Sequence, residues 1–214
     1  MIITIDGPAG AGKSTIARAL ARRLGFGFLD TGAMYRAVTL AGMRRRLDWD
    51  RPDELAELAR GVEIELVDDR VFLDGEDVSR AIRTREVTRL SRHAAGNPAV
   101  RQRLVDLQRA AAGGKDMVTE GRDQGTVVFP DARCKVFLTA SPEERAVRRV
   151  RDLEARGESA TLAEVLGEQE RRDRRDSSRS VGPLVKASDA VELNTDGMTP
   201  EQVVDRLVSI VLKV

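Results

Sequence analysis

The sequence predicts an α/β fold built around a parallel β-sheet, and three observations lead to this prediction. Short apolar segments rich in β-branched residues alternate with segments of helical periodicity along most of the 214 residues. A glycine-rich loop separates the first of these strands from the first helix. Between about residues 52 and 90 a local hairpin pattern interrupts the alternation, which indicates an insertion into the parallel core.

The expected strands are short apolar runs bounded by glycine, proline or charged residues. The first, IITID at residues 2–6, ends at Gly7. The other strands of the core are expected at residues 26–30, 117–121, 134–139 and 190–195. In the insertion, residues 62–67 and 70–78 alternate apolar and polar positions around Asp68 and Asp69, which predicts an antiparallel hairpin.

The expected helices are bounded by start and stop signals. Residues 13–24 end at Gly25, a residue type preferred at helix C-termini. Further helices are expected at 32–46, from about 52 onward, and over 80–112 with a break near 96–98. Three later helices begin at hydroxyl N-caps, two of them with a glutamate that completes a capping box: Ser141 with Pro142 and Glu144, Thr161 with Glu164, and Thr199 with Pro200.

Composition excludes several classes of protein. The net charge is +1 although 33% of residues are charged, and a near-neutral balance argues against general nucleic-acid affinity. The single cysteine, Cys134, excludes a disulfide framework and a cysteine-ligated zinc site. No apolar run reaches the roughly 20 residues of a membrane span, and no signal-peptide pattern is seen. We therefore expect a cytoplasmic protein that acts on neither membranes nor nucleic acids.

The loop after the first strand carries the strongest functional signal. GPAGAGKS at residues 7–14 fits the phosphate-binding motif G-x-x-x-x-G-K-[ST], with a strand before it and a helix after it. Backbone N–H groups and the helix N-terminus would cradle an anion. Lys13 would place its charge on the β- and γ-phosphates, and the Ser14 hydroxyl would ligate Mg²⁺. The predicted ATP-binding residues are Gly7, Pro8, Ala9, Gly10, Ala11, Gly12, Lys13, Ser14 and Thr15.

Other parts of the sequence favour a kinase among such P-loop proteins. The guanine-reading pattern [NT]-K-x-D is absent, and the chain is short for a remodelling ATPase. Further anion-binding candidates follow strand ends or lie on helices, as a phosphorylated acceptor would require. They are Thr31 and Arg36, Glu120 with Arg122 and Asp123, the run Arg172, Asp173, Arg175, Asp176 and Arg179, and the run Arg145, Arg148, Arg149 and Arg151. Solvated, salt-bridged helix faces would give the same arginine-rich patterns, and His93 is expected to be structural.

Five stretches together resemble the bacterial cytidylate kinase family of nucleoside monophosphate kinases. They are ITIDGPAGAGKST, LDTGAMYRA, EGRDQGTVVFPDA, RRDRRDSSRSVGPL and DAVELNTDGMTPEQVV, in the order and spacing of that family over essentially the whole chain. This sequence departs from the family pattern in three places: Thr31 replaces a serine, Glu120 replaces an aspartate, and the run from Ser91 to Arg101 is one residue longer.

The resemblance implies a P-loop NTPase fold with a five-stranded parallel sheet flanked by helices. It also implies an inserted NMP-binding subdomain with a short antiparallel sheet, at about residues 52–90, and a helical lid at about 150–180. By the same resemblance, Thr31, Arg36, Arg122 and Arg179 would hold the phosphate of CMP, Arg172 and Asp176 the ribose, and Ser91, Arg101 and Asp123 the cytosine.

The predicted reaction is transfer of the γ-phosphoryl group of ATP to CMP or dCMP. A phosphate oxygen already ionised at pH 7 would attack, so no general base is needed, and catalysis would be positioning and charge neutralisation. Lys13, Arg122, Arg175 and Arg179 are the predicted catalytic residues, with Arg148 or Arg149 as further candidates, and Mg²⁺ would lie at Ser14, with Glu120 acting through water. The alternatives are a P-loop kinase for another nucleotide or metabolite, and a non-kinase P-loop NTPase. The family expectation for oligomeric state is a monomer.

Overall fold

The computed structural model describes residues 1–67, 69–155 and 157–213. Asp68, half of the predicted hairpin connection, lies outside the described residues. The chain divides into two compact units. The first unit comprises Met1–Phe28 and Lys115–Val214, and the second comprises Leu29–Gly114, which contains the segment predicted as an insertion.

The main sheet has five strands in the order β2-β6-β1-β7-β8. Their bounds are Ile2–Asp6 for β1, Gly27–Asp30 for β2, Met117–Gly121 for β6, Cys134–Thr139 for β7 and Val191–Asn194 for β8. The pairings of β1 with β6, β1 with β7 and β7 with β8 are all parallel, as predicted. β1 lies between β6 and β7 in the centre of the sheet. Its carboxyl end is on the side of the sheet where parallel α/β proteins bind ligands.

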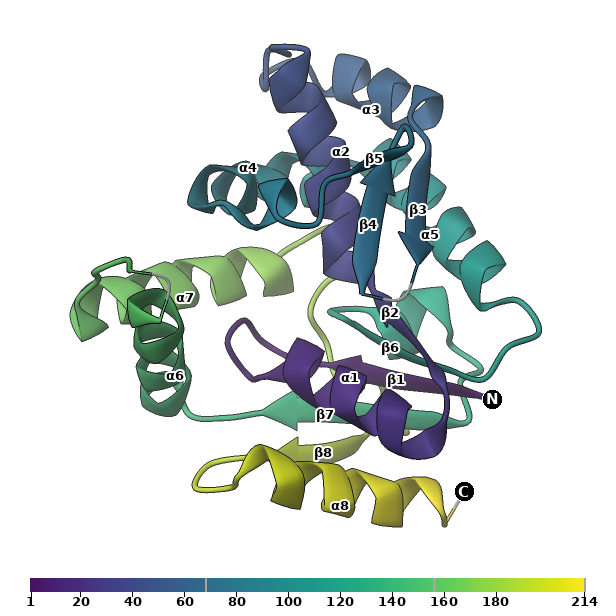
Figure 1. The fold of residues 1–214 in the computed structure, drawn as a ribbon, viewed down its shortest axis with the longest axis vertical. Helices are drawn as coiled ribbons and strands as arrows, with labels where there is room; N and C mark the ends of the chain where they lie inside the picture. Colours follow the sequence, from purple (N-terminus) through teal and green to yellow (C-terminus); the bar gives the residue numbers. More distant parts are fainter. Residues whose placement is uncertain (68, 156, 214) are drawn as a thin grey trace. The chain divides into compact units, whose positions relative to one another are not determined.

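Two helices of the first unit cover one face of this sheet (Figure 1). α1, Lys13–Leu24, and α8, Pro200–Val211, contact each other and bury Leu20 and Leu207 completely. These leucines pack in one hydrophobic cluster with Ile5 of β1 and Val136 of β7. This apolar layer fixes the start of α1 directly behind the end of β1.

α6 and α7 form a separate helical pair in the first unit (Figure 1). α6 runs over Pro142–Glu154 and α7 over Leu162–Ser177, and they pack through a small cluster that contains Ala146, Leu153 and Val165. The capping box predicted at Thr161 and Glu164 is present. A short π-helical turn, Gln124–Val128, follows β6.

The capping box predicted at Ser141 is incomplete, because the Ser141 N–H and the Glu144 carboxylate, which would bond to each other, have other partners. The Ser141 hydroxyl caps α6 by accepting from Glu144 N. The Ser141 N–H instead donates to Asp196 Oδ1 at 2.9 Å, and the Glu144 carboxylate accepts from Arg148 Nε at 3.1 Å. The sequence could not show this, because Asp196 reaches Ser141 across 55 residues.

The second unit has its own core and its own small sheet. Helices α2 (Thr31–Arg44), α3 (Pro52–Gly61), α4 (Arg85–Gly96) and α5 (Pro98–Ala112), with the short helix η1 (Ala81–Arg83), bury a cluster that includes Val38, Ile82 and Leu104. The antiparallel sheet contains β3 (Ile64–Val67), β4 (Arg70–Leu73) and β5 (Glu76–Asp77) in that order. The predicted hairpin is therefore confirmed and gains a third strand through a turn at Asp74 and Gly75, both at positive φ.

Membrane insertion by helices finds no support in the described part of the chain, since none of its helices combines the length and the apolar character needed to cross a bilayer.

Candidate active site

The glycine loop joins β1 to α1 in a conformation that depends on three glycines. Gly7, Gly10 and Gly12 have positive φ values of 150°, 80° and 81°. At Gly7 a Cβ would lie 2.0 Å from the backbone oxygen of Leu138 in β7, so the loop approaches the neighbouring strand too closely for any side chain. Gly12 is the N-cap of α1 and supplies no side chain to the cap, which leaves the first amides of the helix for an anion.

Lys13 is buried and bends back over the loop. Its Nζ donates to the carbonyl oxygen of Pro8 at 2.7 Å. Burial lowers the pKa of Lys13 to about 7, and the positive charges of Arg122 and Arg172 act in the same direction, while Glu120 opposes them. Because burial disfavours the charged form of Lys13, a nearby anion would stabilise its ammonium group, as the predicted phosphate contact requires.

Ser14 and Glu120, the two residues predicted to lie at Mg²⁺, contact each other. The Ser14 hydroxyl donates to Glu120 Oε1 at 2.6 Å, and Glu120 is buried at the end of β6. Both groups are hard oxygen ligands of the kind that Mg²⁺ takes, together with waters and phosphates, rather than a full protein cage. The described residues contain no group of three or more His, Cys, Asp or Glu side chains that could hold a metal by themselves.

Asp6, which is not among the predicted site residues, ties the end of β1 to the segment that follows β6. Its Oδ1 accepts from Gln124 N at 2.8 Å and its Oδ2 from Gly125 N at 2.7 Å. Burial raises the pKa of Asp6 to about 6, although these two backbone bonds act against it. A carboxylate that ends an apolar strand was the available signal. Asp6 fixes the position of the turn that begins after Asp123.

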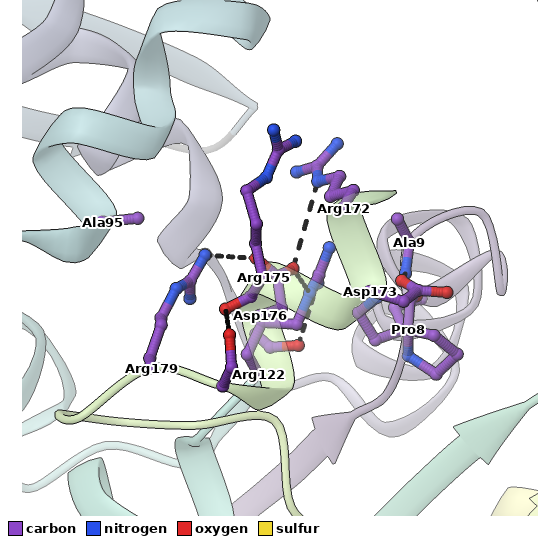
Figure 2. Close-up of polar contacts among 12 residues, drawn as sticks. Pro8, Ala9, Ala95, Arg122, Arg172, Asp173, Arg175, Asp176 and Arg179 are labelled. Atoms are coloured by element: carbon purple, nitrogen blue, oxygen red, sulfur yellow. Dashed lines mark hydrogen bonds and ion pairs between the residues drawn. The ribbon is translucent and has the colours of Figure 1, made fainter. Parts of the chain in front are cut away.

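A buried carboxylate gathers three of the predicted acceptor arginines (Figure 2). Asp176 of α7 accepts from Arg122 Nε at 2.9 Å and also binds Arg179, while Arg172 Nε lies 4.0 Å from Oδ2. Burial alone would raise the pKa of Asp176, but the charges of Arg122, Arg179 and Arg172 outweigh it and hold the pKa below its ordinary value. The tertiary structure thus brings residues 122, 172, 176 and 179 together around one carboxylate.

Asp123 and Arg175 differ in their surroundings. Asp123 is buried directly after Arg122, at the N-cap of the π-helical turn. Arg175 is exposed on α7, and its guanidinium makes no ion pair within the described residues (Figure 2).

Arg145 and Arg148 on α6 both have structural partners. Arg148 donates to the Thr195 hydroxyl and carbonyl oxygens at 3.0 and 2.9 Å as well as to Glu144, so this candidate for the transferring phosphate is anchored to the loop after β8. Arg145 is buried and bonds to the carbonyl oxygens of Ala9 and Ala140.

In the second unit, Asp30 organises the first pair of predicted phosphate ligands. Asp30 ends β2 and caps α2 by accepting from Ala33 N at 2.9 Å. The same carboxylate accepts from Arg36 Nη2 at 3.2 Å, and Arg83 Nη2 lies 3.6 Å away. Thr31 is buried at the first position of α2. Asp30, which was not predicted as a site residue, therefore holds Arg36 near the strand end.

The predicted cytosine contacts of the second unit lie on adjacent helices. Ser91 is on α4, where its hydroxyl donates to the carbonyl oxygen of Thr88 at 2.8 Å. Arg101, on α5, is almost fully buried, donates to the carbonyl oxygen of Ala95 at 3.2 Å and lies over the Tyr35 ring.

The only histidine of the sequence has a structural environment, as expected. His93 packs against Trp49, with ring centroids 5.3 Å apart, and partial burial lowers its pKa.

Comparison with known proteins identifies the family. The family model described as Cytidylate kinase matches residues 3–213. A cytidylate kinase of Rhodopirellula baltica is 54% identical over 99% of this chain and 92% of its own length, and one of Desulfitobacterium hafniense is 51% identical over 97% and 91%. A bifunctional pantoate ligase/cytidylate kinase of a Synechococcus strain is 47% identical over 97% of this chain and 40% of its own length.

Solved structures support the fold at much lower identity. The shikimate kinase of Bacteroides thetaiotaomicron is 15% identical and aligns over 100% of this chain and 99% of its own with a TM-score of 0.53. TT1252 of Thermus thermophilus is 20% identical over 100% and 96%, with a TM-score of 0.51. These likenesses concern architecture alone. The match to the family model and the full-length identities together show that this chain belongs to the cytidylate kinase family.

Proposed function

We propose that this protein transfers the γ-phosphoryl group of ATP to CMP or dCMP, giving ADP and CDP or dCDP. The observation that carries the proposal is the arginine cluster around Asp176, because it gives the unit with the glycine loop a second site for an anion. Membership of the cytidylate kinase family, with relatives of that name at about half identity, supports cytidine nucleotides as the acceptors.

The donor half would be built by residues 7–15. Amides of the loop and of the α1 N-terminus would bind the phosphates of ATP, and the Lys13 ammonium would leave the Pro8 carbonyl for the β- and γ-phosphates. The Ser14 hydroxyl would ligate Mg²⁺ directly and Glu120 through water, with the ion supplying charge neutralisation. The 2.6 Å contact between Ser14 and Glu120 supports this assignment.

The acceptor half is proposed from the residues that the family resemblance implies. We propose that Thr31, Arg36, Arg122 and Arg179 hold the phosphate, that Arg172 and Asp176 contact the ribose, and that Ser91, Arg101 and Asp123 bind the cytosine. Cytosine offers an N4 amino donor and acceptors at N3 and O2, so a carboxylate with an arginine and a hydroxyl matches it. Uracil would place its 4-oxo group against the carboxylate of Asp123, and this unmatched buried acceptor would reject it.

Catalysis would rest on positioning and on cationic charge. The CMP phosphate is ionised at pH 7 and attacks the γ-phosphorus in line, so no general base is needed. Lys13, Arg122 and Arg179 would neutralise the charge that develops, and exposed Arg175 would join them. Because Arg148 is anchored to Thr195, Arg149 is the remaining candidate on α6 to act beside Arg175.

We further propose roles for two segments of the chain, together with an oligomeric state and a cellular compartment. Residues 52–90 would form the NMP-binding subdomain, and residues 150–180 the lid that excludes water during transfer. The enzyme would be a monomer in the cytoplasm, with nucleotides as its partners and neither nucleic acid nor membrane. The near-neutral net charge argues against general nucleic-acid affinity, and a single cysteine with a free thiol fits a reducing compartment.

An acceptor panel tests the activity. ADP release from ATP should depend on CMP or dCMP and be much weaker with UMP or AMP. A preference for AMP would contradict the cytosine assignment, and ADP release that ignores every acceptor would favour the non-kinase alternative. Lys13→Ala should abolish transfer, whereas Lys115→Ala, at an exposed lysine, should not.

A second test addresses base recognition. Asp123→Ala should reduce discrimination between CMP and UMP while ATP affinity is kept, because the proposed contact is to the base. Asp131→Ala, an exposed aspartate of the same segment, is the matched control. Equal loss of CMP and ATP affinity in Asp123→Ala would count against the assignment.

A further inference from the structure

Both backbone polar groups of Ala9, in the middle of the glycine loop, are held by a largely buried ion pair from α6 and α7. Ala9 N donates to Asp173 Oδ1 at 3.1 Å, and Ala9 O accepts from Arg145 Nη1 at 2.7 Å. The same Nη1 donates to Asp173 Oδ2 at 2.5 Å, which closes a ring of three contacts. The side chains of Arg145 and Asp173 are 7% and 19% exposed, so solvent screens this pair little.

Further hydrogen bonds hold Arg145 of this ion pair in place. Arg145 Nε donates to Ala140 O at 3.2 Å, and buried Gln169 of α7 donates from Nε2 to Arg145 O at 3.1 Å. A Cβ on Gly10 would lie 2.6 Å from Gln169 Nε2, so the loop packs directly against α7. The turn at Ala9 and Gly10 can therefore shift only if α6 and α7 yield or shift with it.

α7 also carries the carboxylate that holds the predicted acceptor arginines. Asp173 and Asp176 are three residues apart, which places them on neighbouring positions of one helix face. Asp173 contacts the donor loop, whereas Asp176 contacts Arg122 and Arg179. A single helical turn thus connects the two sets of anion-binding groups (Figure 2).

We propose that Asp173, acting through Ala9 and Arg145, is a positioning residue that sets the glycine loop for ATP and aligns it with the arginines on Asp176. The inference rests on the proposed function, in which those arginines hold the CMP phosphate. Asp173 itself touches neither nucleotide. Its charge keeps Arg145 on the Ala9 carbonyl, and its Oδ1 keeps the Ala9 amide in place.

The test compares Asp173→Asn with wild type and with Glu170→Gln, a change on the exposed side of the same helix. In Asp173→Asn the amide N–H₂ must face either the Arg145 guanidinium or the Ala9 N–H, and both are donors, so the ring of contacts opens in either orientation. We expect the dissociation constant for ATP, measured without acceptor, to rise about tenfold and kcat to fall about tenfold, as loss of one charged hydrogen bond allows. CMP affinity measured without ATP should stay within about twofold, and Glu170→Gln should change none of these values.

A second variant separates positioning from folding. Asp173→Leu combined with Arg145→Met removes both charges and leaves no buried ion without a partner, so its melting temperature should fall less than that of Asp173→Asn. It should nevertheless keep the ATP-binding defect, because both Ala9 groups lose their partners.

The proposal is overturned if Asp173→Asn lowers only the melting temperature and leaves ATP affinity and kcat within about twofold, or if ATP and CMP affinities fall equally. Recovery of full ATP affinity in the double variant would overturn it as well. The acceptor panel on wild type decides the proposed function independently, since ATP binding is measured here without an acceptor.

Discussion

The carboxylate of Asp176 holds two arginines at a buried position, and its replacement by asparagine should destabilise the fold measurably. Asp176 is 4% exposed in its side chain, and Arg122 and Arg179 are each 16% exposed. Asparagine keeps one accepting oxygen, so Asp176→Asn loses about one charge-assisted bond and leaves two arginines without their counter-charge. We expect the free energy of unfolding to fall by about 3 kcal/mol, equivalent to roughly 6–12 °C in melting temperature for a domain of this size.

Equilibrium unfolding in urea measures this change, with Asp205→Asn as the control. Asp205 also pairs with an arginine, Arg23, at 3.1 Å, but both side chains are more than half exposed, so its loss should cost under about 1 kcal/mol. If the two variants lose the same free energy, the argument that burial makes the Asp176 cluster strong is refuted.

The pH dependence gives the same experiment a second arm. Because the pKa of Asp176 in the folded protein lies below its ordinary value, its stabilisation is fully present above that ordinary value and is lost as the pH falls through the folded pKa. The difference in free energy of unfolding between wild type and Asp176→Asn should therefore stay constant above about pH 5 and become smaller below about pH 4. A difference that grows on acidification would contradict the cause assigned to the shift.

Three further predictions concern the glycine loop and the strand before it. Burial lowers the pKa of Lys13 to about 7, so ATP binding should take up close to one proton at about pH 8 and much less at about pH 6, measured by calorimetry in buffers of different ionisation enthalpy; equal uptake at both pH values would contradict this. Burial raises the pKa of Asp6 to about 6, so wild type should gain stability relative to Asp6→Asn as the pH falls. The gain in free energy of unfolding, measured in urea, should be about 1.4 kcal/mol between about pH 7.5 and 5. A difference in free energy between the two proteins that does not change with pH would refute this prediction. Gly7→Ala should lower the melting temperature much more than Gly12→Ala, because a Cβ meets the backbone of Leu138 only at Gly7, and similar losses would show that the close approach is unimportant.

Local sequence signals were sufficient where neighbours in the chain decide the structure. The loop at residues 7–14 was recognisable because its strand, glycines and helix are contiguous. Helix ends such as Gly25 and Thr161 were predicted correctly for the same reason, since a cap depends on a few adjacent residues. The third strand of the small sheet was missed, because a turn at Asp74 and Gly75 leaves only a two-residue strand.

Partnerships across the chain could not be deduced from these signals. The run RRDRRDSSR was equally compatible with a solvated helix face, and only folding shows that Asp176 is buried between Arg122 and Arg179 while Arg175 stays exposed. The role of Asp6 is likewise not visible in the sequence, because its partners, the amides of Gln124 and Gly125, lie more than 100 residues away.

The sequence by itself determined the α/β class, the phosphate loop, the resemblance to its family and the arginines that an acceptor phosphate would need. The tertiary structure decided which of those charges are buried and paired. Arg145 and Asp173 belong to arginine-rich runs of the sequence. Only the folded structure shows that they pair with each other and hydrogen-bond to the backbone of Ala9. The physical reason is that periodicity and caps are local, whereas the energy of a charge depends on burial and on partners that only the folded chain supplies.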